Sequence, residues 1–419
     1  MDFWDLLSIK NVNSAPGPGR FKFVVVSGDF PKNGVALPFG NYAVRRAALR
    51  EFYLYKGKTF WSKAKIRLLQ VFNFALVWKT AFPKKFFANL DPAGENLSSF
   101  LASKIGSAEP IIFSIYVGSR KFIFPIFGKK SGRFLGVAKV YFPGRESADY
   151  GENEARILNY LSKVDLPEFS FPRVIAKDYF QQSLIVILFP LLTKHSNILQ
   201  NVGMFCDARK INSIGKPHID FLQKMSEKTG KKNLFRESNF HKEFQKEIGF
   251  LKSKISEKLE LVEYFWDKAA QNLQGKEFIF SLTKREFPFF EALRSNDKLF
   301  VIDWETARFD FPPIFDVFSM ILSTSPHQKG DYIKIYRKNI QALFFCNNPR
   351  VRELLEKMLD FWNMSKEDAY WFFWLFLIDQ LYIHLHVDHW PSAKRILSFL
   401  QNARNNEIDF SKRWISSRR

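Results

Sequence analysis

Cysteine is nearly absent from this sequence, since only Cys206 and Cys346 occur among 419 residues. Two cysteines cannot build a disulfide framework or a four-cysteine zinc site, which favours a reducing compartment. Acidic residues are also scarce beside basic ones, 42 against 63, so the formal net charge is +21. A surplus of that size predicts attraction to an anionic partner, such as a nucleotide, a lipid headgroup or a nucleic acid.

Long apolar runs are missing as well. The best candidates, residues 68–77 and 369–378, are about half as long as the roughly 20 residues that a membrane-spanning helix needs. The first residues, Met-Asp-Phe-Trp-Asp, are acidic where a secretory signal would be basic. We therefore expect a cytoplasmic protein that does not span a membrane.

Aromatic residues, by contrast, are abundant, with 48 Phe, 13 Tyr and 10 Trp. Apolar residues make up 46% and charged residues 25% of the chain. That balance is typical of globular proteins and excludes a disordered or collagen-like chain. The length predicts two or three folded units with cores rich in aromatic rings.

The first hundred residues are predicted to form an N-terminal extension. A β-rich run at Phe21–Ser27 is followed by turn residues over 28–40 and by a helical, basic segment over 41–87. Between Arg45 and Lys85 the chain has eleven basic residues and one acid. This pattern fits an amphipathic extension with a solvated basic face, or a surface that sits on anionic lipid, peripheral to the inner face of a membrane. Nucleic-acid binding is the weakest interpretation, because no zinc-finger or RNA-recognition motif is present.

Strand patterns begin after residue 101. Three β-rich runs, 111–117, 121–127 and 134–142, are joined by turn residues and predict an antiparallel meander. A helix over 148–164 and a hairpin over 173–189 should follow. The remainder is predominantly helical, with an island of strand and loop at 276–307 and helices predicted at 217–228, 240–273 (bent near Gly249), 331–345, 350–362, 366–387 and 392–402.

Lys139 is the first candidate functional residue. It lies in the middle of the third predicted strand, among apolar neighbours, where an unpaired ammonium group would be costly. Glu154 lies fifteen residues later on the next predicted helix. A strand lysine held by a helix glutamate is an arrangement that contacts nucleotide phosphates in protein kinases. The turn Gly128–Gly132, just before the strand, is a weaker candidate for covering those phosphates.

Two acids at the end of a later apolar strand form the second candidate. Asp303 and Glu305 follow the run Leu299–Ile302. A carboxylate at the end of a strand, followed by a loop, is suited to holding Mg²⁺.

These residues resemble the aminoglycoside phosphotransferase and choline kinase family, which has the protein-kinase fold. Ile302-Asp-Trp-Glu305 matches the family's second metal motif, and Pro313-Ile-Phe-Asp316 resembles its Pro-x-x-Asp segment. Val137-Ala-Lys139 and Glu154 match its nucleotide-anchoring lysine and helix glutamate. The layout also resembles, more loosely, phosphotransferase-like proteins of bacterial surface-glycan synthesis.

The catalytic loop departs from that family. Where the family has His-Gly-Asp-x-x-x-x-Asn, this chain has Lys284-Arg-Glu286-Phe-Pro-Phe-Phe-Glu291. The resemblance makes Glu286 the catalytic base and Glu291, with Asp303 and Glu305, the Mg²⁺ ligands. The added methylene of glutamate displaces a carboxylate by about one bond length, and a misplacement of roughly 1 Å can slow a reaction ~100-fold. Both an active but altered kinase and a pseudokinase fit these changes.

The resemblance implies an α+β, two-lobed protein-kinase-like fold with a small antiparallel-sheet N-lobe at 101–190 and a helical C-lobe at 191–419, behind the extension at 1–100. It also implies ATP and Mg²⁺ as cofactors and a small-molecule or glycan hydroxyl as acceptor. The alternatives are a pseudokinase that binds nucleotide or glycan without efficient turnover, and a peripheral membrane or scaffold protein. The string His384-x-His386-x-x-His389 is expected to belong to a structural helix, because His384 and His386 point about 200° apart.

Overall fold

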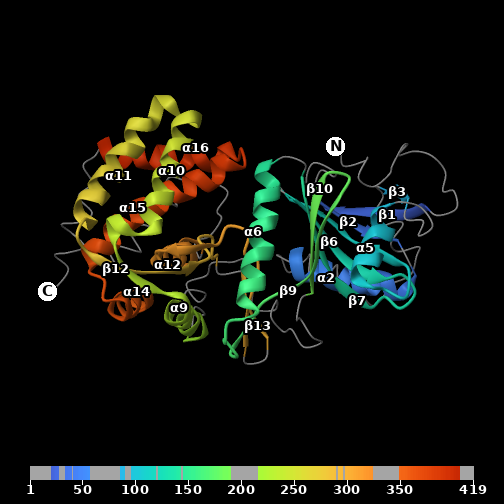
Figure 1. Cartoon of the computed structure of the whole chain (residues 1–419). Helices are drawn as coiled ribbons and strands as arrows, with labels where there is room; N and C mark the ends of the chain where they lie inside the picture. Colours follow the sequence, from blue (N-terminus) through green and yellow to red (C-terminus); the bar gives the residue numbers. More distant parts are fainter. Residues whose placement is uncertain are drawn as a thin grey trace. The chain divides into compact units, whose positions relative to one another are not determined.

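The computed structural model describes residues 20–27, 34–39, 41–56, 85–89, 96–118, 121–142, 145–189, 216–288, 291–295, 298–323 and 349–405 (Figure 1). The chain divides into two compact units. Unit 1 is Met1–Ser162 with Phe171–Thr193, and unit 2 is Lys163–Ser170 with Lys194–Arg419. Among the described residues, no helix combines the length and the apolar character needed to cross a lipid bilayer.

Unit 1 is built on one antiparallel sheet with the strand order β3-β1-β2-β5-β6-β7-β10-β9, and β4 pairs with β6. Its strands are β1 (Arg20–Ser27), β2 (Gly34–Pro38), β3 (Lys85–Asn89), β4 (Ile111–Phe113), β5 (Ile115–Val117), β6 (Lys121–Gly128), β7 (Phe134–Tyr141), β9 (Arg173–Phe180) and β10 (Ser183–Phe189). The meander of β4 to β7 and the hairpin of β9 and β10 confirm the strands predicted between residues 111 and 189.

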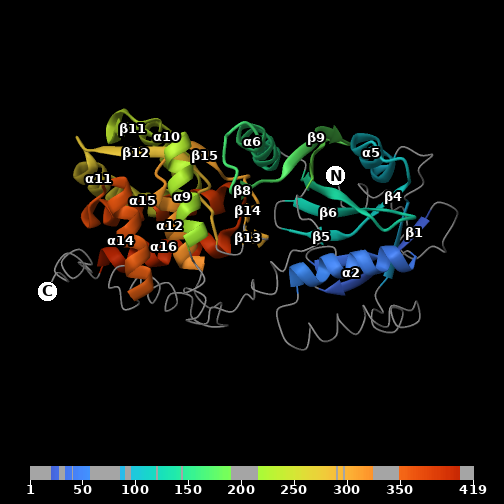
Figure 2. The same ribbon diagram turned by 90° about the horizontal axis from the view of Figure 1, so that it is seen from below.

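Three helices pack on this sheet: α2 (Tyr42–Lys56), α5 (Leu97–Ile105) and α6 (Arg145–Leu161). Figure 2 shows α2 and α5 on opposite sides of strands β5 and β6. α2 buries Val44, Ala48 and Leu49 in the aromatic core of the sheet, whereas Arg46 on the same helix is exposed. Helix α2 thus has one buried apolar face and an exposed basic residue within the described part of the extension.

Two predictions in the extension were wrong. Residues 34–38 were expected to be turns, but they form β2, which pairs with β1 and β5. Residues 85–87 were expected to end a helix, but they belong to β3, which pairs with β1. In both cases the neighbouring strands supply backbone hydrogen-bond partners that local composition does not reveal. Most of the basic segment at 45–85 lies outside the described residues.

Unit 2 is mainly helical. Its helices are α9 (Lys216–Thr229), η1 (Phe235–Glu237), α10 (Asn239–Lys254), η2 (Ser256–Lys258), α11 (Leu259–Leu273), α12 (Ile314–Ser323), α14 (Pro349–Trp362), α15 (Lys366–His386) and α16 (Trp390–Asn405). α15 begins with a capping box between Ser365 and Asp368. It is buried on all sides, as expected of a helix that is apolar all round. The helix predicted at 331–345 lies outside the described residues.

Short strands complete unit 2: β8 (Phe169–Ser170), β11 (Lys231–Leu234), β12 (Glu277–Thr283), β13 (Ala292–Ser295), β14 (Lys298–Val301) and β15 (Arg308–Phe311). They form two sheets, β11-β12-β15 and β13-β14-β8. The long helix predicted over 240–273 breaks at Ile255 instead of Gly249, since η2 separates α10 from α11 there. The two units together confirm an α+β class with an antiparallel-sheet N-terminal region and a helical C-terminal part.

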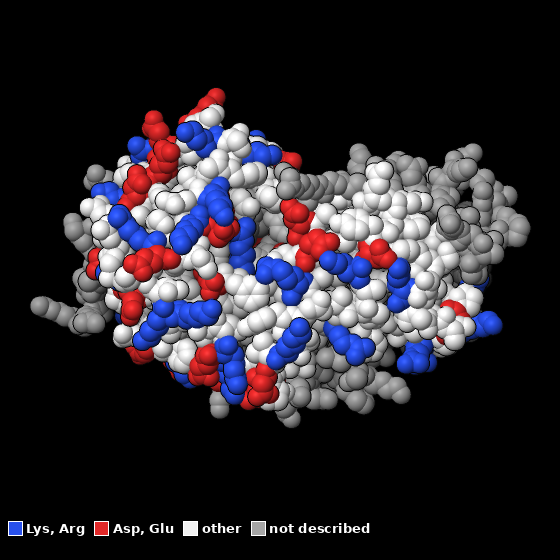
Figure 3. All heavy atoms as spheres, in the orientation of Figure 1, with Lys and Arg blue, Asp and Glu red and all other residues white. Residues whose placement is uncertain are grey.

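Charge on unit 2 is mixed in sign. On the face shown in Figure 3, acidic and basic side chains of the described residues of this unit lie interspersed. Nucleic-acid-binding surfaces usually carry Lys and Arg clustered along one stripe. The face of unit 2 in Figure 3 shows no such stripe among the described residues.

Candidate functional site

Lys139 and Glu154 form a buried pair in unit 1. Side chains two apart on a strand share a face, so Lys139 and Tyr141 of β7 both point toward α6. The ammonium nitrogen of Lys139 lies 2.6 Å from Oε1 of Glu154, and the Tyr141 hydroxyl donates to Oε2 at 2.9 Å. Glu154 is fully buried and Lys139 is 7% exposed. The predicted ion pair is therefore present, and both oxygens of its carboxylate have donors.

A glycine one turn before Glu154 permits this contact. A Cβ atom at Gly151 would lie 2.6 Å from Tyr141 Cδ2 and 2.6 Å from Leu184 Cδ2. Real Cβ atoms do not approach other atoms that closely, so a side chain at Gly151 would push α6 away from β7 and β10. The absence of a side chain at Gly151 thus lets Glu154 reach the sheet.

The turn Gly128–Gly132 lies away from this pair. The β6–β7 register places Lys139 opposite Ile123, whereas Phe127 near the turn pairs with Phe134. Five residues of extended strand separate Phe134 from Lys139, about 16 Å. The structure does not bring these two glycines to Lys139. The end of β5 at Val117, which pairs with Phe122, lies at the Lys139 end of the strands.

The Glu109 side chain accepts hydrogen bonds from the Gly128–Gly132 turn. Its Oε2 accepts hydrogen bonds from the backbone N–H groups of Lys130 (2.9 Å) and Ser131 (3.1 Å), and its Oε1 accepts one from the Ser131 hydroxyl. These hydrogen bonds lower the pKa of the Glu109 carboxyl. The donors that a phosphate would use at this turn are therefore already bound to a carboxylate of the chain.

In unit 2, a carboxylate on α12 holds the segment that resembles a catalytic loop. Oδ2 of Asp316 accepts the Lys284 N–H at 2.9 Å, and Oδ1 accepts the Arg285 N–H at 2.8 Å. Arg285 has a φ of 68°, a left-handed backbone conformation that is strained for a residue other than glycine. Burial raises the pKa of Asp316 to about 7, against the opposing effect of its two N–H donors. Asp316 thus fixes the backbone just before Glu286.

The Arg285 side chain is anchored in a buried charge network. Its Nε donates to Asp379 Oδ1 at 2.9 Å, and its Nη2 donates both to that oxygen and to Glu247 Oε1, the latter at 2.9 Å. Arg308 Nη1 reaches the same Glu247 oxygen at 2.9 Å. Burial raises the pKa of Glu247 to about 7, although both guanidinium groups oppose that rise. The Arg285 side chain is therefore held by α10 and α15.

Lys284 and Glu291 form a second ion pair beside Glu286. The Lys284 ammonium donates to Glu291 Oε2 and, at 2.6 Å, to the backbone carbonyl of Glu286. The Glu291 side chain is 16% exposed and that of Lys284 is 1% exposed. Burial raises the pKa of Glu291 to about 8, and the negative charges of Asp303 and Glu286 add to the rise, while Lys284 opposes it. The Lys284 ammonium group thus holds both the Glu291 carboxylate and the backbone of Glu286.

Backbone contacts tie the Asp303 turn to this loop. The Ile302 N–H donates to the Glu291 carbonyl at 3.1 Å. The Thr306 hydroxyl donates to the Lys284 carbonyl at 3.0 Å. These two contacts place the turn that carries Asp303 beside Glu291 and Lys284.

Trp304 fixes the turn that follows β14, which ends at Val301. Its indole N–H donates to the Val301 carbonyl at 3.0 Å, and its ring packs edge-on against Phe221. Asp303 itself has a φ of 63°, a strained backbone conformation of the kind that clusters at functional sites. Glu305, two residues later, is 7% exposed. The buried tryptophan thus anchors a turn that carries two carboxylates.

Sequence reasoning missed several of these residues. Asp316 was noticed only as part of a motif, and Asp379 was not singled out as a site residue. Glu247 was missed entirely, although its i,i+4 spacing from Glu243 marks an acidic face of α10. The histidines of α15 lie among rings, with His386 5.4 Å from Phe250.

The chain is similar to known proteins in its structure and not in its sequence. No family model matches the chain, and no curated protein sequence matches it. Eighty-three chains of solved structures match. One is the gentamicin complex of APH(2'')-IIa, at 16% identity and a TM-score of 0.42, covering 72% of this chain and 94% of that one. Another is a thermostable mutant of aminoglycoside phosphotransferase APH(4)-Ia in its apo form, at 14% identity and a TM-score of 0.40, covering 75% and 100%.

A third is spectinomycin phosphotransferase APH(9)-Ia in complex with ADP and spectinomycin, at 14% identity and a TM-score of 0.38, covering 73% and 93%. The structures named here are thus aminoglycoside phosphotransferases of low sequence identity.

Proposed function

We propose that this protein is a phosphotransferase of the protein-kinase-like type, which transfers the γ-phosphoryl group of ATP to a hydroxyl of a small molecule or glycan. The observation that carries the proposal is the buried ion pair of Lys139 and Glu154. An ammonium group inside a sheet, fixed at 2.6 Å by a fully buried carboxylate, is positioned but still able to donate further hydrogen bonds. Such a lysine suits nucleotide phosphates, which need a fixed cation.

Unit 2 supplies the groups for the remaining tasks. Asp303 and Glu305 offer carboxylate oxygens, the ligands that Mg²⁺ prefers, so the donor set fits this ion. Mg²⁺, when bound, would neutralise phosphate charge. Glu286 is the base that would accept the proton of the acceptor hydroxyl. Asp316 would position Glu286, because it binds the two N–H groups that precede it.

A second candidate function has its own support. The ion pair between Lys284 and Glu291 commits the Glu291 carboxylate to an internal partner, which reduces its availability to a metal ion. This pairing favours a pseudokinase that binds nucleotide and turns it over slowly or not at all. Association with an anionic membrane through residues 45–85 stays a prediction, because most of that segment lies outside the described residues.

Turnover of ATP with candidate sugar and amine acceptors separates the two functions. An active enzyme should lose at least 100-fold in kcat in the Glu286→Gln variant with little change in nucleotide affinity, because a base acts mainly in the transition state. Glu277→Gln, an exposed acid on β12, is the matched control and should leave kcat unchanged. Nucleotide binding without turnover by the wild type would instead support the pseudokinase.

A further inference from the structure

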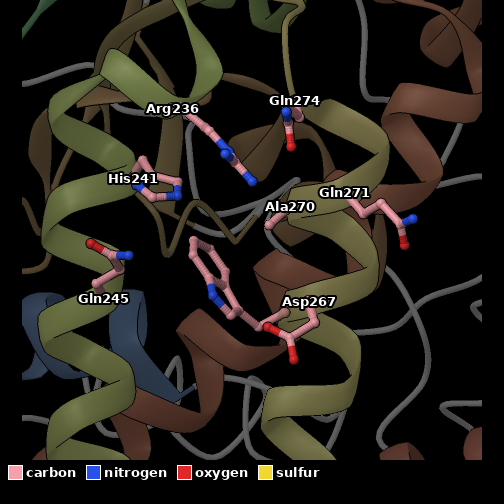
Figure 4. Close-up of a pocket in the computed structure, with 8 residues that line it drawn as sticks. Arg236, His241, Gln245, Asp267, Ala270, Gln271 and Gln274 are labelled. Carbon is pink, nitrogen blue, oxygen red and sulfur yellow. The ribbon is translucent and has the colours of Figure 1, made fainter.

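A cavity of about 440 Å³ opens in unit 2 between α10 and α11, beside η1 (Figure 4). Residues that line this α10–α11 cavity include Arg236, His241, Gln245, Trp266, Asp267 and Gln274. Its volume lies in the range of small-molecule sites, about 300–1,000 Å³.

The cavity is separate from the candidate phosphotransfer residues. On α10, His241 and Gln245 line it, four residues apart on one face. Glu243 and Glu247, on the opposite face of the helix, contact Arg308 instead. The cavity therefore lies across α10 from the network that holds Arg285.

Polar groups that surround the cavity have no internal partners. Within the described part of the chain, the side chains of Arg236, Gln245, Asp267 and Gln274 make no hydrogen bond or ion pair with other residues. Figure 4 shows the Arg236 and Gln274 side chains extending into the space between the two helices. Their hydrogen-bonding capacity is thus available to a ligand.

Aromatic rings form the remaining wall. The Trp266 ring stacks on Phe244 at 5.2 Å between centroids and lies 5.1 Å from the His241 ring. Burial, aided by the positive charge of Arg236, lowers the pKa of His241. The cation among the lining residues is therefore Arg236.

We propose that the α10–α11 cavity binds an acidic sugar, a polyhydroxylated ring that carries a carboxylate or a phosphate group. The guanidinium fork of Arg236 matches the two oxygens of such an anionic group. Glutamine amides both donate and accept hydrogen bonds, as sugar hydroxyls do, and the Asp267 carboxylate accepts from hydroxyl donors. The indole of Trp266 offers an apolar surface to the C–H groups of the ring.

Ligand-observed NMR titration of the full chain, without nucleotide or Mg²⁺, tests this site. The probes are glucuronate, glucose 6-phosphate, glucose and inorganic phosphate. At least one acidic sugar should bind with a Kd about tenfold below those of glucose and phosphate, and the stronger of the two acidic sugars identifies the anionic group. Arg236→Gln should weaken that binding about tenfold, and Gln274→Ala should weaken it less, because one charge-assisted contact outweighs one neutral contact.

Lys242→Gln is the matched control, since Lys242 is an exposed lysine next to His241 on another face of α10. It removes the same charge and should leave the Kd unchanged. The proposal is overturned if neither acidic sugar binds saturably, if glucose or phosphate alone binds equally well, or if Arg236→Gln and Lys242→Gln have the same effect. Because no ATP is present, this result is independent of phosphotransfer.

Discussion

At the scale of single residues, two lysine–glutamate pairs join α6 to the sheet of unit 1 in contrasting surroundings. Lys139 and Glu154 are buried, whereas Lys177 and Glu152 expose 42% and 39% of their side chains. Removing one member of a buried pair leaves an uncompensated charge, while exposed pairs contribute little. The two pairs therefore allow a matched comparison.

Lys139→Met should lower the free energy of unfolding by about 3 kcal/mol, because it strands the Glu154 carboxylate in the core. Lys177→Met should lower it by less than about 1 kcal/mol. Urea unfolding followed by circular dichroism measures both. Equal effects of the two substitutions would show that Lys139 is not held in a buried pair.

Glu247 gives a pH dependence of defined sign. Its folded-state pKa is raised to about 7 from 4.5, so the folded protein retains a proton that the unfolded chain has released. Its contribution to stability is therefore present below pH 4.5 and is lost as the pH rises toward 7. The Glu247→Gln variant has no titratable carboxyl group at this position and therefore serves as the reference.

The free energy of unfolding of the wild type, minus that of Glu247→Gln, should thus fall by about 2 kcal/mol between pH 5 and pH 7.5. Urea unfolding at intervals over that range measures the difference. A difference that rises with pH would mean that Arg285 and Arg308 keep the carboxylate ionised throughout.

At the scale of elements, Gly151 determines how closely α6 approaches the sheet. Gly151→Ala should cost about 1–3 kcal/mol of stability, because the added methyl group would overlap Tyr141 and Leu184. Gly249→Ala on α10 is the control, since no atom beyond its chain neighbours and the backbone of its own helix lies within 4 Å of its Cβ position. It should stabilise the protein by up to about 1 kcal/mol. Thermal unfolding of both variants tests the difference, and destabilisation of similar size in both would contradict the close approach at Gly151.

Periodicity predicted most elements but not those that depend on distant partners. β9 and β10 fall on the predicted residues because alternation and turn residues are local signals. β2 and β3 were missed because their pairing with β1 is a contact between distant segments. By contrast, the pairing of Lys139 with Glu154 could be predicted, because a lysine in an apolar strand needs an acidic partner. The hydrogen bonds of Asp316 with the N–H groups of Lys284 and Arg285 could not be predicted, because they join segments about thirty residues apart in the sequence.

At the scale of the whole molecule, the candidate phosphotransfer residues fall in both units. Unit 1 holds Lys139, and unit 2 holds Glu286, Asp303 and Glu305. The net charge of +21 favours anionic ligands in general. Binding of a nucleotide must therefore be tested through the named residues and not through charge alone.

Calorimetric titration of ATP with and without Mg²⁺ is the most direct test of the proposed function. The wild type should bind ATP more tightly when Mg²⁺ is present. Lys139→Met, checked for folding by circular dichroism, should weaken that binding at least tenfold, and Asp303→Asn should abolish the Mg²⁺ effect. Asp360→Asn, an exposed acid on α14, should behave as the wild type. Absence of ATP binding by the wild type, or affinity that neither Lys139→Met nor Asp303→Asn changes, would contradict the proposed function.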